Sequence, residues 1–166
     1  MSANNARVSS GAGLAEWDLV LTRTFDAPRE VVFRAWTDPK TLAVWWGPKG
    51  FSNPVCEVDA REGGEIRIHM RAPDGVVYPM KGVFEEVDEP ERLIFISTAL
   101  DEKGNSMFDV LNTVTLAEVG GKTSLTLRAQ WSACFWRTRY RPRRHPLCAF
   151  TSATTPMVEF RPTLRG

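Results

Sequence analysis

Short extended segments separated by turn residues are the feature that most constrains the fold of this chain. Between Gly50 and residue 130, runs with apolar side chains at every second position are separated by Gly-Gly, Asp-Gly or Glu-Pro. This period of two is typical of strands with one buried face, and short turns join neighbouring strands in antiparallel pairs. We therefore expect six strands paired in chain order as a meander, at residues 55–59, 65–71, 76–87, 92–98, 108–116 and 123–129.

One strand and two helices are expected before this meander. Apolar and polar side chains alternate from Trp17 to Thr24, which predicts the strand. The run Asp26–Glu30 places acids beside a helix start and a proline in the first turn, so we expect a helix from about Pro28 to Trp36. Thr37-Asp38-Pro39 has the same signature and predicts a second, short helix that ends by Gly47-Pro48. The predicted fold class is α+β, with the order β-α-α-β(6) and a curved antiparallel sheet.

The two ends of the chain differ from this central domain, which we place at residues 16–130. Residues 1–15 are small and polar without periodicity, so we expect a disordered leader. Residues 131–166 form an Arg/Pro-rich tail with seven arginines, no lysine and one acid, Glu159. Four prolines interrupt this tail, so no long amphipathic helix is expected there. Our hypothesis is a shifted reading frame from about Trp131 onward, and translating the neighbouring frame tests it, because a Gly-Trp-containing amphipathic helix should emerge.

Composition and cysteine spacing exclude several functional classes. The chain has no apolar run near the ~20 residues of a membrane span and no apolar core of a signal peptide at its start, so we expect a cytoplasmic protein with no membrane span. Cys56, Cys134 and Cys148 lack metal-ligand spacing, which predicts reduced thiols and no metal. The Arg137–His145 run resembles an RNA-binding segment but is short and follows an acidic domain, so we expect no nucleic-acid partner.

Several ordered motifs resemble a known protein family. They are TFDAPREVVFRAWTDP from Thr24, WWGPKG from Trp45, DAREGG from Asp59, the turn Asp74-Gly75 and GVFEEVDEPERL from Gly82. Over residues 17–130 the chain is similar to the START-like (SRPBCC, or helix-grip) superfamily. Within that superfamily it most resembles the C-terminal domain of the activator of the heat-shock-protein-90 ATPase. The resemblance implies a curved sheet that grips a long C-terminal helix, with a cavity between them; because the tail departs from the family pattern, we expect that helix to be absent or replaced.

Twelve apolar side chains are our candidate lining of a ligand cavity. Trp45, Trp46 and Phe51 form the densest aromatic cluster, and flat rings stack well on apolar or aromatic ligands. Strand positions in one phase supply the other nine: Ile66, Ile68, Met70, Tyr78, Met80, Phe84, Phe95, Leu125 and Leu127. Each has an alternative structural role, because the tryptophans can lock the helices onto the sheet and the strand residues can fill the core.

The sequence contains no arrangement typical of a catalytic site. His69 alternates with Ile68 and Met70 and is predicted to face solvent, whereas Tyr78 could offer its hydroxyl to a bound carbonyl. No second histidine lies in the folded part, and no nucleophile or carboxylate pair accompanies these two residues. We therefore expect no catalytic residue and no cofactor. Arg61–Gly64 is expected to be a structural turn, since it lacks the strand-to-helix setting of a phosphate-binding loop.

Three functions remain open from the sequence. The leading hypothesis is a binding module that buries a small hydrophobic or aromatic molecule. The family resemblance suggests a second, a protein that interacts with a chaperone and regulates its ATPase. The third is an enzyme of the aromatase/cyclase type, which would need Tyr78 or His69 as its acid or base. The superfamily includes all three kinds of protein, so the choice must come from the site.

Overall fold

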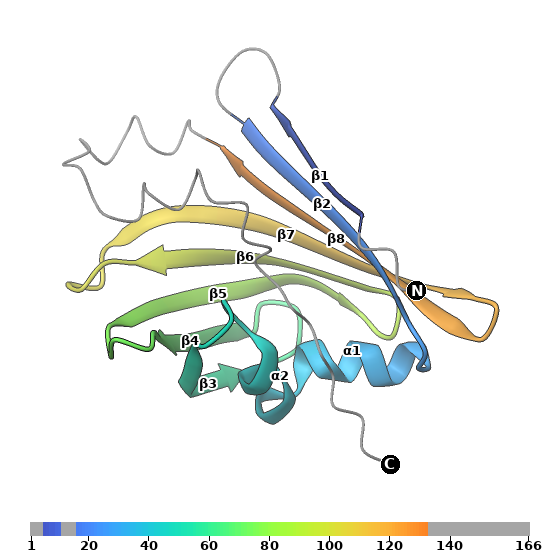
Figure 1. Ribbon diagram of the computed structural model, residues 1–166, viewed down its shortest axis with the longest axis horizontal. Coiled ribbons are helices and arrows are strands. Elements are labelled where there is room, and N and C mark those ends of the chain that lie inside the picture. Colours follow the sequence, from blue (N-terminus) through green and yellow to red (C-terminus); the bar gives the residue numbers. More distant parts are fainter. Residues whose placement is uncertain (1–4, 11–15, 133–166) are drawn as a thin grey trace.

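The computed structural model describes residues 5–10 and 16–132 of the chain (Figure 1). The elements in chain order are β1 (Asn5–Ser10), β2 (Glu16–Phe25), α1 (Arg29–Thr37), α2 (Pro39–Trp45), β3 (Ser52–Val58), β4 (Glu65–Arg71), β5 (Val77–Asp88), β6 (Arg92–Leu100), β7 (Ser106–Val119) and β8 (Lys122–Ser132). The α+β class and the predicted succession of one strand, two helices and six strands are confirmed from β2 onward. The predictions for the tail beyond Ser132, including the reading-frame hypothesis, Cys134, Cys148 and the Arg137–His145 run, lie outside the described residues.

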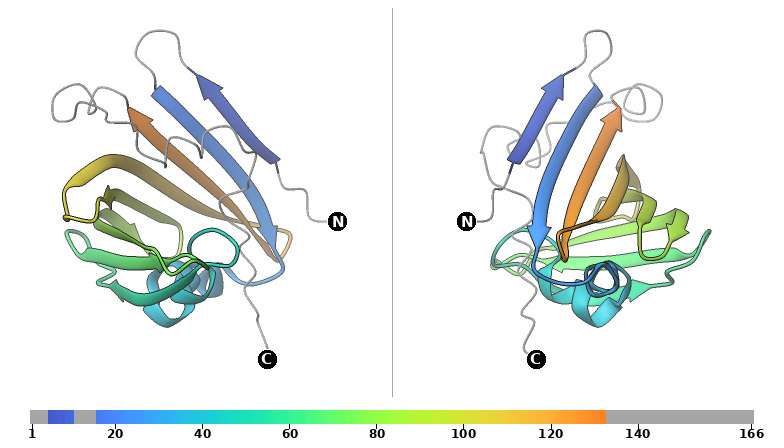
Figure 2. Two further views of the ribbon diagram at one scale, coloured as in Figure 1. Left: turned by 60° about the vertical axis from the view of Figure 1, so that its left-hand side comes forward. Right: turned by 90° about the vertical axis from the view of Figure 1, so that its right-hand side faces the viewer.

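The eight strands form one antiparallel sheet in the order β1-β2-β8-β7-β6-β5-β4-β3. Strands β3 to β8 are neighbours in chain order, as the short turns predict, and β2 closes onto the last of them, β8. The sheet is strongly curved, so that β1, β2 and β8 stand steeply relative to β4 and β5 (Figures 1 and 2). Register shifts between Phe84 and Glu86 in β5 and between Ala99 and Leu100 in β6 occur in the middle of the sheet, where bulges increase the local bend.

The expectation of a disordered leader is wrong for residues 5–10. These residues form β1, which pairs antiparallel with β2 from Asn5 opposite Thr22 to Ser10 opposite Trp17. Without β1, β2 would be an edge strand with a row of unpaired backbone N–H and C=O groups. Pairing with such an edge requires only backbone groups, so a segment without apolar alternation can form a strand there.

The two helices begin in different ways. At α2 the Asp38 carboxylate accepts a hydrogen bond from the Thr41 backbone N–H at 2.9 Å, and Pro39 occupies the first turn, as the sequence predicts. At α1 the residue before the first turn is Pro28, and no side chain caps the helix. The expectation that Asp26 caps this helix start is therefore wrong; its carboxylate lies 3.7 Å from the ammonium group of Lys122, the first residue of β8.

Both helices lie against one end of the concave face of the sheet (Figures 1 and 2). Helix α1 contacts β7 and β8, and α2 contacts β3. The core between these layers consists of helix side chains that include Val32, Phe33, Trp36, Leu42 and Trp45, and of concave-face side chains from β4 to β8. The other end of the concave face receives no helix from the described part of the chain.

Candidate functional site

The strand residues predicted to line a cavity do share one face of the sheet. Direct cross-strand partners have their side chains on the same face, and Ile68 pairs with Met80, Met70 with Tyr78 and Phe84 with Phe95. The pairs Val114–Leu127 and Leu116–Leu125 continue this face on β7 and β8. The predicted phase of the alternation is therefore correct, and the face is the concave one that the helices cover in part.

Most of the twelve candidates belong to the packed core. Eight are at most 7% exposed: Trp45, Ile66, Ile68, Met80, Phe84, Phe95, Leu125 and Leu127. They form one cluster with the buried faces of α1 and α2. These eight side chains therefore fill the core, which is the alternative role that the sequence also allowed. Whether any of them also contacts a ligand stays a prediction.

An aromatic cluster holds the helices on the sheet. The Trp36 ring lies 4.7 Å from that of Trp45 and 6.4 Å from that of Phe95, in tilted or edge-on arrangements that aromatic pairs favour. The Trp45 indole N–H donates to the Ala35 carbonyl at 2.9 Å. Trp45 is therefore a packing residue that connects the end of α2 to the end of α1.

Four of the twelve candidates are only half-buried: Trp46, Phe51, Met70 and Tyr78. The ring of Trp46 lies 6.4 Å from that of Phe95, and Phe51 and Tyr78 are 6.0 Å apart. The loop that carries Trp46 is anchored by Asn53, whose amide donates to the carbonyls of Ala43 and Trp46 at 2.9 and 2.8 Å. These four side chains lie where the core ends and the open part of the concave face begins.

The concave face also contains a set of small, mostly buried residues, which the sequence analysis missed. Cross-strand pairing places Gly82 beside Ser97, while Ala99 and Ala129 lie on the same face; we call these four residues the concave floor. Half-buried apolar side chains surround the floor, and we call them the rim: Leu19, Met70, Tyr78, Phe108 and Val110. A signal in the sequence of β7 could have revealed this region. Every second residue on that strand is apolar except the central asparagine: Phe108, Val110, Asn112, Val114 and Leu116.

Asn112 and Ser97 form a buried polar pair at this floor. Asn112 is 8% exposed and Ser97 9%. The Asn112 amide nitrogen donates to the Ser97 hydroxyl at 2.9 Å and to the Val110 carbonyl at 3.0 Å. These are the polar side chains that interrupt the apolar concave surface of β6 and β7.

The two residues considered for acid or base chemistry lie on opposite faces of the sheet. Tyr78 pairs with Met70 on the concave face, whereas His69 pairs with Pro79 and so faces the convex side, as predicted. A single site cannot use both. Cys56 lies on the concave side of β3 opposite Ile68, and burial raises the pKa of its thiol to about 11, so it is a poor nucleophile at neutral pH.

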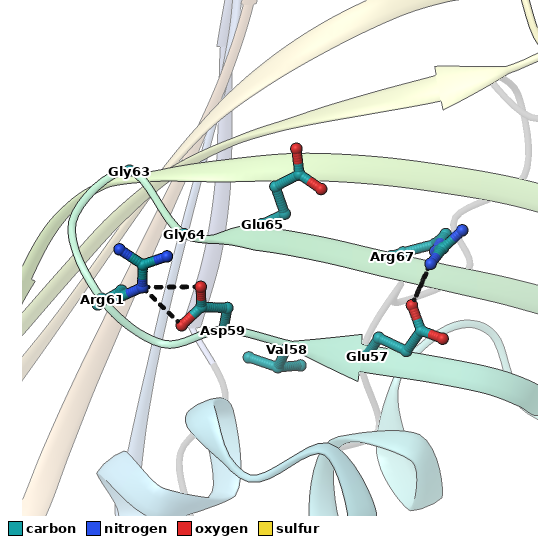
Figure 3. A pocket seen from close by; sticks show the side chains of 8 residues that line it. All are labelled: Glu57, Val58, Asp59, Arg61, Gly63, Gly64, Glu65 and Arg67. Carbon is teal, nitrogen blue, oxygen red and sulfur yellow. Dashed lines mark hydrogen bonds and ion pairs between the residues drawn. The ribbon is translucent and has the colours of Figure 1, made fainter.

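The structure contains a polar pocket of about 490 Å³ away from the concave face, at the turn between β3 and β4 (Figure 3). None of the twelve candidates lines it. Four of its five charged residues form pairs, since Arg61 binds Asp59 within the turn and Arg67 binds Glu57 across the strands. The turn is held by backbone bonds that include Gly64 N–H to the Arg61 carbonyl at 2.8 Å, so Arg61–Gly64 is the structural turn that we expected.

The described residues contain neither a cluster of metal-ligand side chains nor a membrane-spanning helix. In residues 5–10 and 16–132, no group of three or more His, Cys, Asp or Glu side chains could hold a metal ion. Neither α1 nor α2 has the length and apolar character needed to cross a membrane.

Comparison with known proteins places the chain in a family. Residues 26–147 match the family described as activator of Hsp90 ATPase homolog 1-like protein. No curated protein matches significantly. Among solved structures, a protein from Nitrosomonas europaea is 33% identical, with 68% of this chain and 73% of that chain covered and a TM-score of 0.58.

Two other solved structures have the same fold. A protein from Chromobacterium violaceum is 31% identical over 69% of this chain and 79% of its own, with a TM-score of 0.63. A protein from Mycobacterium smegmatis is 28% identical over 78% and 79%, with a TM-score of 0.65. Because the family match spans most of the chain and the curved sheet with its two helices is that of a START-like protein, this chain belongs to the family of activator of Hsp90 ATPase homolog 1-like proteins.

Proposed function

We propose that this protein binds a small hydrophobic or aromatic molecule on the open part of its concave face, without transforming it chemically. The observation that carries this proposal is the combination of the concave floor and the rim. Gly82 has no side chain and Ala99 only a methyl group, while rim residues such as Tyr78 and Phe108 remain half-buried around them. A concave sheet surface with small residues at its base and large, half-buried apolar side chains beside them suits an apolar ligand.

The binding free energy would come from the removal of apolar surface from water. Half-buried side chains such as Met70, Tyr78 and Val110 still expose part of their apolar surface, and a ligand would cover it at about 25 cal/mol per Å². Met70 also has the flexible, polarisable side chain that adapts to ligands of different shape. Of the two acid or base candidates, Tyr78 alone shares the concave face, since His69 faces the convex side, and this is why we prefer binding to the aromatase/cyclase alternative.

A matched pair of variants tests this proposal. Val110 and Leu111 are neighbours on β7 whose side chains lie on opposite faces, and Leu111 is 38% exposed on the convex side. We expect 2-methoxynaphthalene to bind the wild-type chain, and Val110→Lys to raise its Kd more than about tenfold, because the ligand would have to desolvate an ammonium group. Leu111→Lys should leave the Kd unchanged. Isothermal titration calorimetry measures all three, and a wild-type chain that binds no apolar probe contradicts the proposal.

The family match favours one second candidate, interaction with a chaperone of the heat-shock-protein-90 type. This function would use an outer surface of the domain and does not require the concave face. A pull-down with the cell's own chaperone and a measurement of its ATP turnover test it. If the chain neither binds the chaperone nor changes its turnover, the candidate is removed, and the result for the concave face is unaffected.

A further inference from the structure

A buried asparagine in the middle of an apolar sheet face is unusual, and Asn112 is such a residue. Its direct partners on β6 and β8 are Phe95 and Ala129. Burial of a carboxamide costs free energy unless each of its polar atoms finds a hydrogen bond. If the amide oxygen has no donor within the protein, a ligand on the concave face can supply one. The direction in which this oxygen points therefore matters.

The hydrogen bonds of the Asn112 amide determine its orientation. Its nitrogen faces three acceptors: the Ser97 hydroxyl oxygen at 2.9 Å, the Val110 carbonyl at 3.0 Å and the Phe95 carbonyl at 3.5 Å. Turning the amide by 180° would place Oδ1 against the Val110 carbonyl, so that two acceptors would face each other. The nitrogen must therefore face the sheet backbone, and Oδ1 must face away from it.

The outward oxygen has no partner in the described part of the chain. No hydrogen bond within residues 5–10 and 16–132 reaches Asn112 Oδ1, and this atom is not among the enclosed ones that lack a partner, which are Trp36 Nε1 and Asn53 Oδ1. Asn112 Oδ1 thus retains some exposed area, although the residue as a whole is only 8% exposed. The Ser97 hydroxyl accepts from Asn112, and within the same residues its own hydrogen has no acceptor.

We propose that the ligand of the concave face is an apolar molecule with a hydroxyl group, and that this hydroxyl lies between Asn112 and Ser97. It donates to Asn112 Oδ1 and accepts from the Ser97 hydroxyl. An ether or a ketone accepts only and leaves Oδ1 unsatisfied, while a carboxylate adds a charge that must be desolvated. The inference rests on the proposed function, since it names the chemical class bound at that same face.

Two probes that differ in a single hydrogen-bond donor test the inference. The first is 2-naphthol, and the second is its methyl ether, 2-methoxynaphthalene. Isothermal titration calorimetry with the full chain should give a Kd for 2-naphthol about five- to tenfold lower than that for the ether, which is the usual effect of one added hydrogen bond. Equal affinities for the two probes overturn the hydroxyl inference and leave the proposed function standing; no binding of either probe overturns both.

Variants on the two faces of β6 and β7 locate the effect. Asn112→Leu should abolish the preference for 2-naphthol while the ether still binds, and Ser97→Ala should reduce the preference. Thr113→Val is the matched control, since Thr113 pairs with Ile94 on the convex side, and it should retain the full preference. If Asn112→Leu fails to fold by circular dichroism, Ser97→Ala decides the matter. A preference that survives in the folded variants contradicts the inference.

Discussion

At the scale of single residues, buried hydrogen bonds connect distant parts of this chain. Thr123, at the start of β8, is fully buried, and its hydroxyl donates to the Ala27 carbonyl at 2.6 Å. The bond joins segments 96 positions apart and holds the link between β2 and α1 against the sheet. The contribution of such a bond lies less in its own strength than in the cost of leaving a buried carbonyl without a donor.

We expect Thr123→Val to lower the free energy of unfolding by about 1–2 kcal/mol, because the isosteric side chain fills the same space but leaves the Ala27 carbonyl without its donor. Urea denaturation measures this difference. Thr115→Val on the exposed convex side of β7 is the control and should change stability by less than about 0.5 kcal/mol. Equal effects of the two substitutions would show that the buried bond has no special role.

At the scale of elements, caps and close contacts between strands stabilise the structure. The Asp38 carboxylate accepts hydrogen bonds from the hydroxyl and the backbone N–H of Thr41, and these bonds hold the pKa of Asp38 below its usual range. Between β5 and β6 the backbones approach closely at Gly82, where a Cβ atom would lie 2.6 Å from the Ile96 carbonyl oxygen. Asp38 determines where α2 begins, and Gly82 allows the curvature that forms the concave floor.

Asp38→Ala should lower the free energy of unfolding by about 1 kcal/mol, the usual contribution of a helix N-cap. Since the carboxyl pKa is depressed in the folded state, its ionised form contributes stability above the unfolded value of about 3.9, and this contribution is lost as the pH falls through the folded pKa. The stability difference between wild type and Asp38→Ala should therefore shrink at acidic pH. An NMR titration that places the Asp38 pKa at or above the unfolded value would contradict the expectation.

Gly82→Ala should destabilise the sheet by about 1–3 kcal/mol, because the added methyl group must displace the backbone of β6. Thermal unfolding monitored by circular dichroism measures the effect. Val83→Ala, at the neighbouring position on the convex face where the side chain is 41% exposed, is the comparison and should cost much less. A Gly82→Ala protein as stable as wild type would mean that β5 and β6 can separate at this point without cost.

At the scale of the whole molecule, the domain is built on one continuous sheet with β3 and β1 at its edges. The two helices cover only one end of the concave face of this sheet. Strand β1 lies at one edge and pairs with β2 alone. Strand β2 in turn pairs with β8 over ten positions, from Glu16 opposite Ser132 to Phe25 opposite Thr123. The fold should therefore survive the loss of β1, while β2 becomes the new edge.

Deletion of residues 1–10 should leave the secondary structure intact and increase amide hydrogen exchange in β2, since the segment from Trp17 to Thr22 would lose its pairing with β1. Exchange in β4 to β7 should stay at the wild-type rate. Hydrogen-exchange mass spectrometry resolves these segments. If exchange rises throughout the sheet, β1 is an integral part of the cooperative unit instead of an edge addition.

Much of this architecture could be predicted because its signals are local. Turn residues such as Asp74-Gly75 and Gly120-Gly121 separate the strands, and the alternation of apolar and polar side chains within a strand shows which face is buried. The predicted strand at residues 65–71, for example, is β4. The cap of α2 was also predictable, since Asp38 and Pro39 act within one turn. The start of α1 was not, because its N-cap position is Pro28, whose side chain offers no hydrogen bond, and Asp26 lies two residues before it.

The sequence by itself determined the order of the elements, the antiparallel meander and the set of side chains that share the concave face, because each depends on residues a few positions apart. Only the tertiary structure decided which of those side chains are core and which form the rim, since that depends on where α1 and α2 dock. It also placed β1 at the edge and brought Asn112 to Ser97 on the concave face. The docking of α1 on β7 and β8 joins segments far apart in the chain, and the Asn112–Ser97 contact depends on the exact register of β6 and β7; a periodic pattern carries no information about either.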